Sequence, residues 1–234
     1  MPAIAVFTDT ANFADISSSP QSTSVSIGTA ASDRLAFIYL FNVDGNNTGK
    51  FINSVTIGGV TATKVDDAYF TAGDGVGESG WWWAALPSGI SATLSISFSS
   101  TPSDNGIIAV VYSVTGADTT TPVSDANADG MNFGDPSAAV TIPTDGVLLA
   151  GTSTYRAGAV SFNGWTNATS DQAGLGGTLI AGFIAMRTET ALSATPGSPT
   201  VVAEWSHTNN FLSLVAVQAG APPYSLLFNQ QLRY

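Results

Sequence analysis

The sequence has no cysteine and only one histidine among its 234 residues. The absence of cysteine excludes disulfide bonds and thiolate metal sites. Zinc sites and histidine-based triads need further partners around the imidazole, so a zinc site at His207 would require an unusual set of carboxylates. We therefore predict that His207 is a solvated turn residue.

Basic residues are also scarce, because lysine and arginine together number six against 17 acidic residues, for a net charge of −11. These six residues are scattered along the chain: Arg34, Lys50, Lys64, Arg156, Arg187 and Arg233. Binding to nucleic-acid phosphates or to an anionic membrane surface would need a basic stripe. We predict neither nucleic acid nor membrane as a partner, and we expect the acidity to maintain solubility.

Long apolar runs are missing as well. No run approaches the roughly 20 residues of a membrane helix, and the first ten residues, MPAIAVFTDT, lack the basic and apolar regions of a secretory leader. We expect a protein that is made in the cytoplasm of its host cell.

Charged residues make up only 10% of the chain, whereas hydrophobic residues make up 44%. A surface covered mainly by serine, threonine, asparagine and glycine suits sheets joined by turns and argues against helical bundles. The alternation of polar and apolar residues over Ser91–Phe98 predicts a strand with one buried face. After turn formers ending at Asn105-Gly106, the apolar stretch Gly106–Thr115 predicts a central strand, paired with the first in an antiparallel hairpin. The stretch Leu35–Phe41 (LAFIYLF) is apolar on both faces, which predicts a strand that is covered on both sides.

A similar order of segments recurs about a hundred residues later. Leu94, Ile96 and Phe98 correspond to Val201, Ala203 and Trp205, and the stretch Val55–Thr61 (VTIGGVT) corresponds to Val160–Thr166 (VSFNGWT). We predict an all-β, antiparallel β-sandwich of the jelly-roll or concanavalin-like kind, with about a dozen strands. The predicted domain covers residues 1–220, with halves at 1–119 and 120–220. Whether these halves form one sandwich or two, and whether they are a true repeat, stays open at this point.

The segment 221–234, APPYSLLFNQQLRY, follows the last predicted strand. Two prolines end that strand, because proline cannot donate to a ladder of hydrogen bonds. Two interpretations remain: a tail that folds back on its own sandwich, or an arm that docks on another subunit. The predicted subunit interface comprises Tyr224, Leu226, Leu227, Phe228 and Tyr234.

Residues 125–130, DANADG, match the opening of a calcium-binding loop. The candidate ligands are Asp125, Asn127 and Asp129. The position where a bidentate glutamate should stand is Pro136, and no helices are predicted on either side. Calcium is therefore the one candidate cofactor, against the alternative that these residues are turn formers in the long connection 117–137.

Trp81-Trp82-Trp83 are consecutive on a predicted strand, which places Trp81 and Trp83 on one face. Exposed tryptophans could stack on a sugar ring, whereas buried ones would fill a core or a subunit interface. We therefore treat Trp81 and Trp83 as candidate ligand-binding or interface residues. Trp165 and Trp205 are interpreted as core residues of the second half.

No pattern of catalytic residues is complete. Asp66, Asp67, Asp74 and Glu78 are close in sequence, but nothing fixes two of them as the opposed pair of a glycosidase. The sequence contains no nucleophile elbow, phosphate-binding loop or dinucleotide fingerprint. We predict a protein that is not an enzyme.

The segments DRLAFIYLF, VTIGGVTAT, GWWWAALPSG, ATLSISFS and GIIAVVYSVTGADTTTPV follow one another over residues 33–123. This order resembles a loosely defined group of jelly-roll, lectin-like sandwich proteins of bacteriophage virions and bacterial surfaces. The resemblance implies a structural virion protein, such as a capsid decoration or tail-fibre component. Its expected partners are copies of itself and other virion proteins. The alternative is a carbohydrate-binding, receptor-binding module that recognises a host glycan.

Overall fold

The computed structural model describes residues 1–44, 51–72, 75–100, 105–157, 161–179, 184–206 and 208–221. Within these ranges the regular elements are 18 β-strands, all paired antiparallel, so the predicted all-β sandwich class is confirmed. None of the described residues forms a helix with the length and hydrophobicity of a membrane span.

The strands divide between the two halves of the chain. The first half contains β1 (Ile4–Ile16), β2 (Gln21–Ser26), β3 (Leu35–Asp44), β4 (Ile52–Ile57), β5 (Val60–Thr61), β6 (Thr63–Lys64), β7 (Ala68–Ala72), β8 (Gly75–Ala85), β9 (Ser91–Phe98) and β10 (Asn105–Thr115). The second half contains β11 (Val123–Phe133), β12 (Ser137–Ala139), β13 (Val147–Ala157), β14 (Phe162–Thr166), β15 (Thr169–Leu179), β16 (Ile184–Ser193), β17 (Thr200–Trp205) and β18 (Thr208–Val217).

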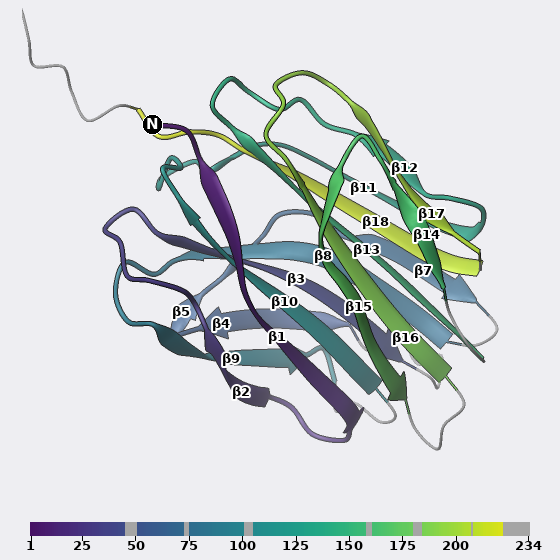
Figure 1. Cartoon of the computed structure of the whole chain (residues 1–234). Helices are drawn as coiled ribbons and strands as arrows, with labels where there is room; N and C mark the ends of the chain where they lie inside the picture. Colours follow the sequence, from purple (N-terminus) through teal and green to yellow (C-terminus); the bar gives the residue numbers. More distant parts are fainter. Residues whose placement is uncertain are drawn as a thin grey trace, which may run out of the picture.

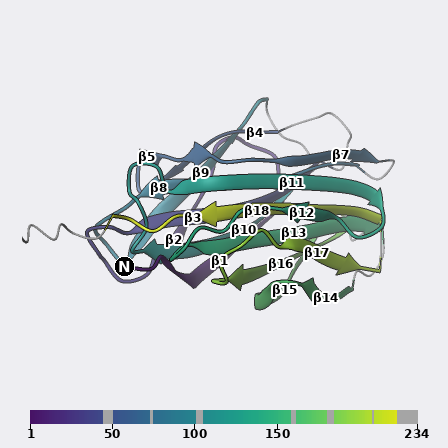
Figure 2. The ribbon, with the colours of Figure 1, turned by 90° about the horizontal axis from the view of Figure 1, so that it is seen from above.

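The strands form four sheets stacked in layers (Figure 1). The first inner sheet has the order β1-β10-β3-β8-β6, with β7 also paired to β8, and the first outer sheet has the order β2-β9-β4-β5. The second inner sheet has the order β11-β18-β13-β16-β15, and the second outer sheet has the order β12-β17-β14. Seen from above, β4 and β14 lie on opposite sides of the molecule (Figure 2).

Each half is therefore its own sandwich, and the two follow the same plan. The path β1-β10-β3-β8 in one half matches β11-β18-β13-β16 in the other, and β2-β9-β4 matches β12-β17-β14. Neighbours in a sheet come from distant parts of the sequence, as in a jelly roll. The two halves therefore repeat the same order of strands in their inner and outer sheets.

The predicted hairpin of Ser91–Ala117 is wrong. β9 pairs with β2 and β4 in the first outer sheet, whereas β10 pairs with β1 and β3 in the first inner sheet. The chain therefore crosses between layers after Phe98. Alternation shows that a strand has a buried face, but it does not show which strand lies beside it.

The predicted match of Val55–Thr61 with Val160–Thr166 is also wrong in register. Ile52 pairs with Phe98, and Phe162 pairs with Trp205. Because Phe98 and Trp205 correspond, Ile52 corresponds to Phe162, a shift of five residues from the predicted match. The Gly58-Gly59 turn, which joins β4 to β5, has no counterpart inside β14.

Three apolar cores separate the four layers. The middle core lies between the two inner sheets and includes Phe37, Trp81 and Phe211; the other two lie between each inner sheet and its outer sheet. Every residue of β3 is buried, which confirms the prediction that LAFIYLF is covered on both faces. The prediction that Gly106–Thr115 is central in its sheet is likewise confirmed, because β10 lies between β1 and β3.

Candidate functional site

The candidate calcium ligands Asp125, Asn127 and Asp129 lie on strand β11, so the predicted loop at this place is wrong. Their alternate spacing puts them on one face of the strand. There the Asp125 carboxylate accepts hydrogen bonds from the backbone N–H groups of Ala126 (2.9 Å) and Thr141 (2.7 Å). The Asn127 amide donates to the carbonyl of Ala139, and Asp129 accepts from the N–H of Ser137. All three side chains fasten β11 to the segment that contains β12.

In the first half, an aspartate outside any calcium motif accepts backbone N–H groups in the same way. Asp9 follows a β-bulge in β1, as Asp125 does in β11, and it accepts from the N–H groups of Thr10 (2.8 Å) and Ser26 (2.6 Å). Among the described residues, no three or more histidine, aspartate or glutamate side chains cluster closely enough to hold a metal ion. The DANADG pattern is explained by backbone hydrogen bonding.

Of the two candidate ligand-binding tryptophans, Trp81 is fully buried in the middle core. Its indole N–H donates to the carbonyl of Ser213 at 3.1 Å, across the boundary between the halves. Stacking of a sugar on Trp81 is therefore contradicted. Trp83 is partly buried and stacks on Phe37, with ring centroids 6.4 Å apart.

The described carboxylates of the acidic segment, Asp66, Asp67 and Glu78, do not form an opposed pair across a cleft. Lys64 lies between Asp67 and Glu78, and its ammonium donates to both carboxylates at 2.9 Å. Glu78 also accepts from the backbone N–H of Ile52, and burial raises its pKa although Lys64 partly offsets the effect. Asp74 and His207 lie outside the described residues. The described members of this cluster stabilise the sandwich.

Asp66 itself points toward the second half. Its Oδ1 accepts a hydrogen bond from the hydroxyl of Ser213 on β18 at 2.8 Å, while its buried Oδ2 has no hydrogen-bond partner. Burial raises the pKa of Asp66 to about 7, and hydrogen bonds from Ser213 and from the backbone of Trp81 offset the burial only in part. Asp66 is thus a titratable group inside the boundary between the halves.

Two further polar contacts across this boundary join hydroxyl groups. The hydroxyl of Tyr39 is 2.9 Å from that of Ser153, and the hydroxyl of Tyr112 is 2.6 Å from that of Thr190. Burial raises the pKa of both tyrosines well above the usual range, so they stay protonated. These contacts fix one half on the other and expose no reactive group.

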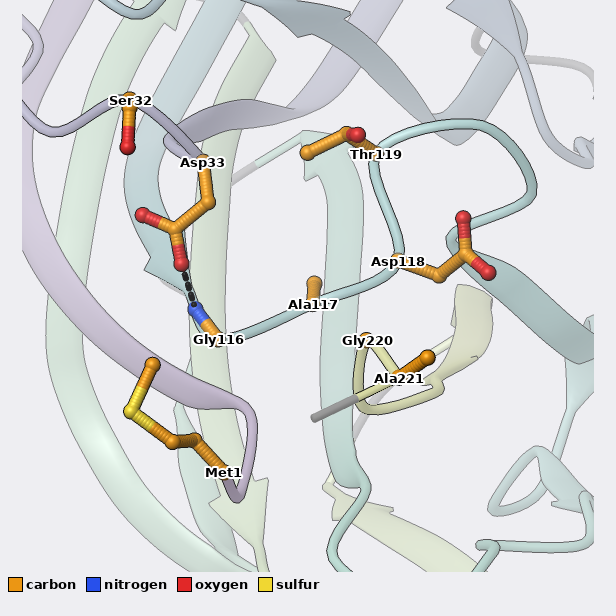
Figure 3. Close-up of a pocket in the computed structure, with 9 residues that line it drawn as sticks. All are labelled: Met1, Ser32, Asp33, Gly116, Ala117, Asp118, Thr119, Gly220 and Ala221. Carbon is orange, nitrogen blue, oxygen red and sulfur yellow. Dashed lines mark hydrogen bonds between the residues drawn. The ribbon is translucent and has the colours of Figure 1, made fainter. Parts of the chain in front are cut away.

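A pocket lies where the halves meet at one end of the molecule (Figure 3). It is lined from one side by Met1 and Asp33, and from the other by Asp118 and Ala221. The Asp33 carboxylate accepts from the N–H of Gly116 at 2.7 Å, and Asp118 caps the following turn by accepting from the N–H groups of Thr120 and Thr121. Both carboxylates are therefore engaged in local structure.

Strand β1 exposes apolar side chains. Within the described residues β1 pairs only with β10, so its other side is an edge of the first inner sheet. Ile4 and Val6 are 54% and 56% exposed, and Val6 borders a cavity of about 470 Å³ against the loop that follows β2. An unpaired edge with exposed apolar residues is a typical protein contact surface. We call Ile4, Val6 and this edge of β1 the β1 edge.

The predicted interface residues Tyr224, Leu226, Leu227, Phe228 and Tyr234 lie outside the described residues. The arm therefore stays a prediction. No sequence signal singled out the β1 edge, because the weak alternation of residues 3–8 gives no indication of which face a neighbouring sheet leaves uncovered.

Comparisons with known proteins name no family for this chain. No family model matches, and no curated protein matches. One solved structure that matches is dimeric latent PorU from Porphyromonas gingivalis, with 10% sequence identity and a TM-score of 0.32 over 94% of this chain. The match spans only 22% of that protein. A likeness this distant carries no argument about function.

Proposed function

We propose that this chain is a non-enzymatic structural protein of a virion, such as a phage capsid decoration or a tail-fibre component, that acts through contacts between subunits. The observation that carries the proposal is the β1 edge. Ile4 and Val6 present apolar surface beside backbone groups without a strand partner, and a second chain can cover both at once.

The use of the polar residues supports a role without catalysis. In the described part of the chain, the carboxylates of Asp9, Asp33, Asp125 and Glu78 each accept backbone N–H groups. A catalytic carboxylate would need to face substrate in an open cleft. The resemblance of residues 33–123 to virion sandwich proteins supplies the setting, with copies of itself and other virion proteins as partners.

The experiment has two parts. Mass spectrometry of purified particles is expected to find this chain in many copies; its absence from particles would contradict the virion role. Light scattering of the purified protein is expected to show an oligomer that Val6→Lys weakens at least tenfold, because the ammonium places a charge in an apolar contact. Ser24→Lys, on an exposed face of β2, is the matched control and should leave the oligomer unchanged.

The alternative function is recognition of a host glycan through Trp81 and Trp83. Trp81 cannot contact a glycan, because it is buried. A glycan site at another place in the fold is a separate question.

A further inference from the structure

The two halves differ in side chains at one matched place, the start of β4 and of β14. Both strands contain a bulge: Ile52 and Ser54 pair with consecutive residues of β9, and Phe162 and Gly164 pair with consecutive residues of β17. A bulge shifts the alternation by one residue, so side chains three apart point to the same face. Ile52 and Val55 therefore correspond to Phe162 and Trp165, and all four point into the space between their two sheets.

In the first half this place is closed. Ile52 and Val55 are buried, and Lys64 crosses over the ring of Trp82, 5.6 Å from its centroid, to reach Glu78. The ion pair and the indole together fill the end of the space between the sheets.

The second half replaces these side chains with smaller ones. The register between the halves follows from the sequence match of residues 33–38 (DRLAFI) with residues 145–150 (DGVLLA), which aligns the neighbouring strands β8 and β16 so that Trp83 corresponds to Leu192. Thr63 pairs with Trp83 and Thr169 with Leu192, so the next residues, Lys64 and Ser170, correspond. By the same pairing Trp82 corresponds to Ala191. A hydroxymethyl group and a methyl group thus stand where the first half has a lysine and an indole.

An open pocket of about 490 Å³ results. Its lining includes Phe162, Asn163, Trp165, Ser170, Arg187 and Glu189. Ligand pockets of proteins commonly have volumes of about 300–1,000 Å³.

The aromatic wall of the pocket is held from behind. The ring of Phe162 packs edge-on to Trp165 at 5.5 Å and against Trp205 at 4.7 Å between centroids. Trp205 is buried, and its indole N–H donates to the hydroxyl of Thr152 at 2.8 Å. The wall is therefore already formed before a ligand arrives, which lowers the cost of binding.

The opposite wall is polar but neutral overall. Arg187 binds Glu189 through two nitrogens, Nε at 2.8 Å and Nη2 at 2.6 Å from Oε1. Arg187 has five N–H donors, of which the contacts with Glu189 use two, and its side chain is 27% exposed at the rim of the pocket. Asn163, Thr169 and Ser170 are exposed beside it and add amide and hydroxyl groups.

We propose that this pocket binds an uncharged saccharide. A sugar ring has an apolar C–H face that can rest on Phe162 and Trp165, and an edge of hydroxyls that can bond Arg187 and its polar neighbours. Anionic ligands are disfavoured because Glu189 neutralises Arg187 and the whole chain carries a charge of −11. The site needs only the isolated protein, so it does not depend on a role in a virion.

The test is a glycan array carrying neutral and acidic oligosaccharides, followed by calorimetric titration with the best-bound neutral oligosaccharide. Wild-type protein is expected to bind neutral glycans. Ser170→Lys, which installs the first half's lysine, is expected to weaken binding at least tenfold. Trp165→Val, which installs the first half's Val55, is expected to weaken it to a similar extent.

Ser24→Lys is the matched control, because it adds the same charge on the outer sheet of the other sandwich, and it should bind like wild type. Thermal melting of each variant confirms folding. No binding of wild-type protein to any neutral glycan, or binding that Ser170→Lys and Trp165→Val both leave intact, overturns the proposal. Absence of the chain from purified particles would contradict the proposed function alone.

Discussion

The two sandwiches share their strand order and the bulge in β4 and β14, yet the side chains that they place at the boundary between them differ in size. At Tyr39, Trp81 and Tyr112 the first half supplies the large side chain, and the second half receives it with Gly151, Ser213 and Thr190. Elsewhere the roles are reversed, because Gly77 of the first half lies against Phe211 and Tyr155 of the second. A face that packs against a copy of itself cannot place two large side chains at the same point. The difference shows how the two halves pack as one molecule: at these points of contact one half supplies a large side chain and the other a small one.

Tyr39 and Gly151 illustrate this division. The sequence match of residues 33–38 with residues 145–150 aligns Ala36 with Leu148. Three residues further along β3 and β13, Tyr39 therefore corresponds to Gly151. The ring of Tyr39 lies directly on Gly151, where any Cβ would overlap it. Corresponding positions therefore meet face to face, and only one of them carries a side chain.

The largest expected effect concerns Asp66, which lies between β6 and β7 of the first half and contacts Ser213 of the second. Because its pKa rises from 3.8 to about 7 on folding, the folded protein holds a proton that the unfolded chain releases between about pH 4 and pH 7. Wild-type stability should therefore fall as the pH rises through this window, by up to about 4 kcal/mol at roughly 1.4 kcal/mol per pKa unit.

Asp66→Asn removes this titration. Urea denaturation of both proteins from pH 4 to pH 8 should show wild type losing stability relative to the variant as the pH rises. Parallel pH profiles would mean that Asp66 does not titrate in the boundary.

The next effect concerns the matched pair at the boundary. Gly151→Val is expected to destabilise the protein by about 1–3 kcal/mol, since the added side chain meets the Tyr39 ring. In the Tyr39→Ala background the same substitution should cost less, because the ring is gone. A double-mutant cycle measures this coupling, and additive effects would contradict the face-to-face contact.

The smallest effect tests the aspartates that accept backbone N–H groups in the same way in both halves. Asp9→Ala and Asp125→Ala should each destabilise the protein by about 0.5–1.5 kcal/mol, because each loses two hydrogen bonds from backbone N–H groups that water can partly replace. Melting temperatures of wild type in excess calcium and in EDTA should agree. Stabilisation by calcium that Asp125→Ala abolishes would restore the predicted metal site.

The sequence predicted the strands better than their neighbours. The apolar residues of β3 and β10 correctly indicated inner strands, because a strand covered on both faces has few polar residues. The crossing after Phe98 was missed, since alternation is the same whichever sheet a strand joins. Strand β11 was missed because aspartate and asparagine bind backbone groups in strands as readily as in turns.

The saccharide pocket could not have been predicted from the sequence either. Trp165 and Trp205 were both predicted as core residues; Trp205 is buried, whereas Trp165 packs against the same core and is only partly buried. The difference depends on Ser170 and Ala191, small residues whose importance emerges only when the registers align them with Lys64 and Trp82.

The central claim is that the two sandwiches form one cooperative unit through the core between their inner sheets. Native-state hydrogen exchange under increasing urea tests it most directly. The amides of β3 and β10 and those of β13 and β18 should converge on one common free energy of opening, equal to that of global unfolding. Protection that persists in β3 and β10 after β13 and β18 have exchanged would show two independent domains.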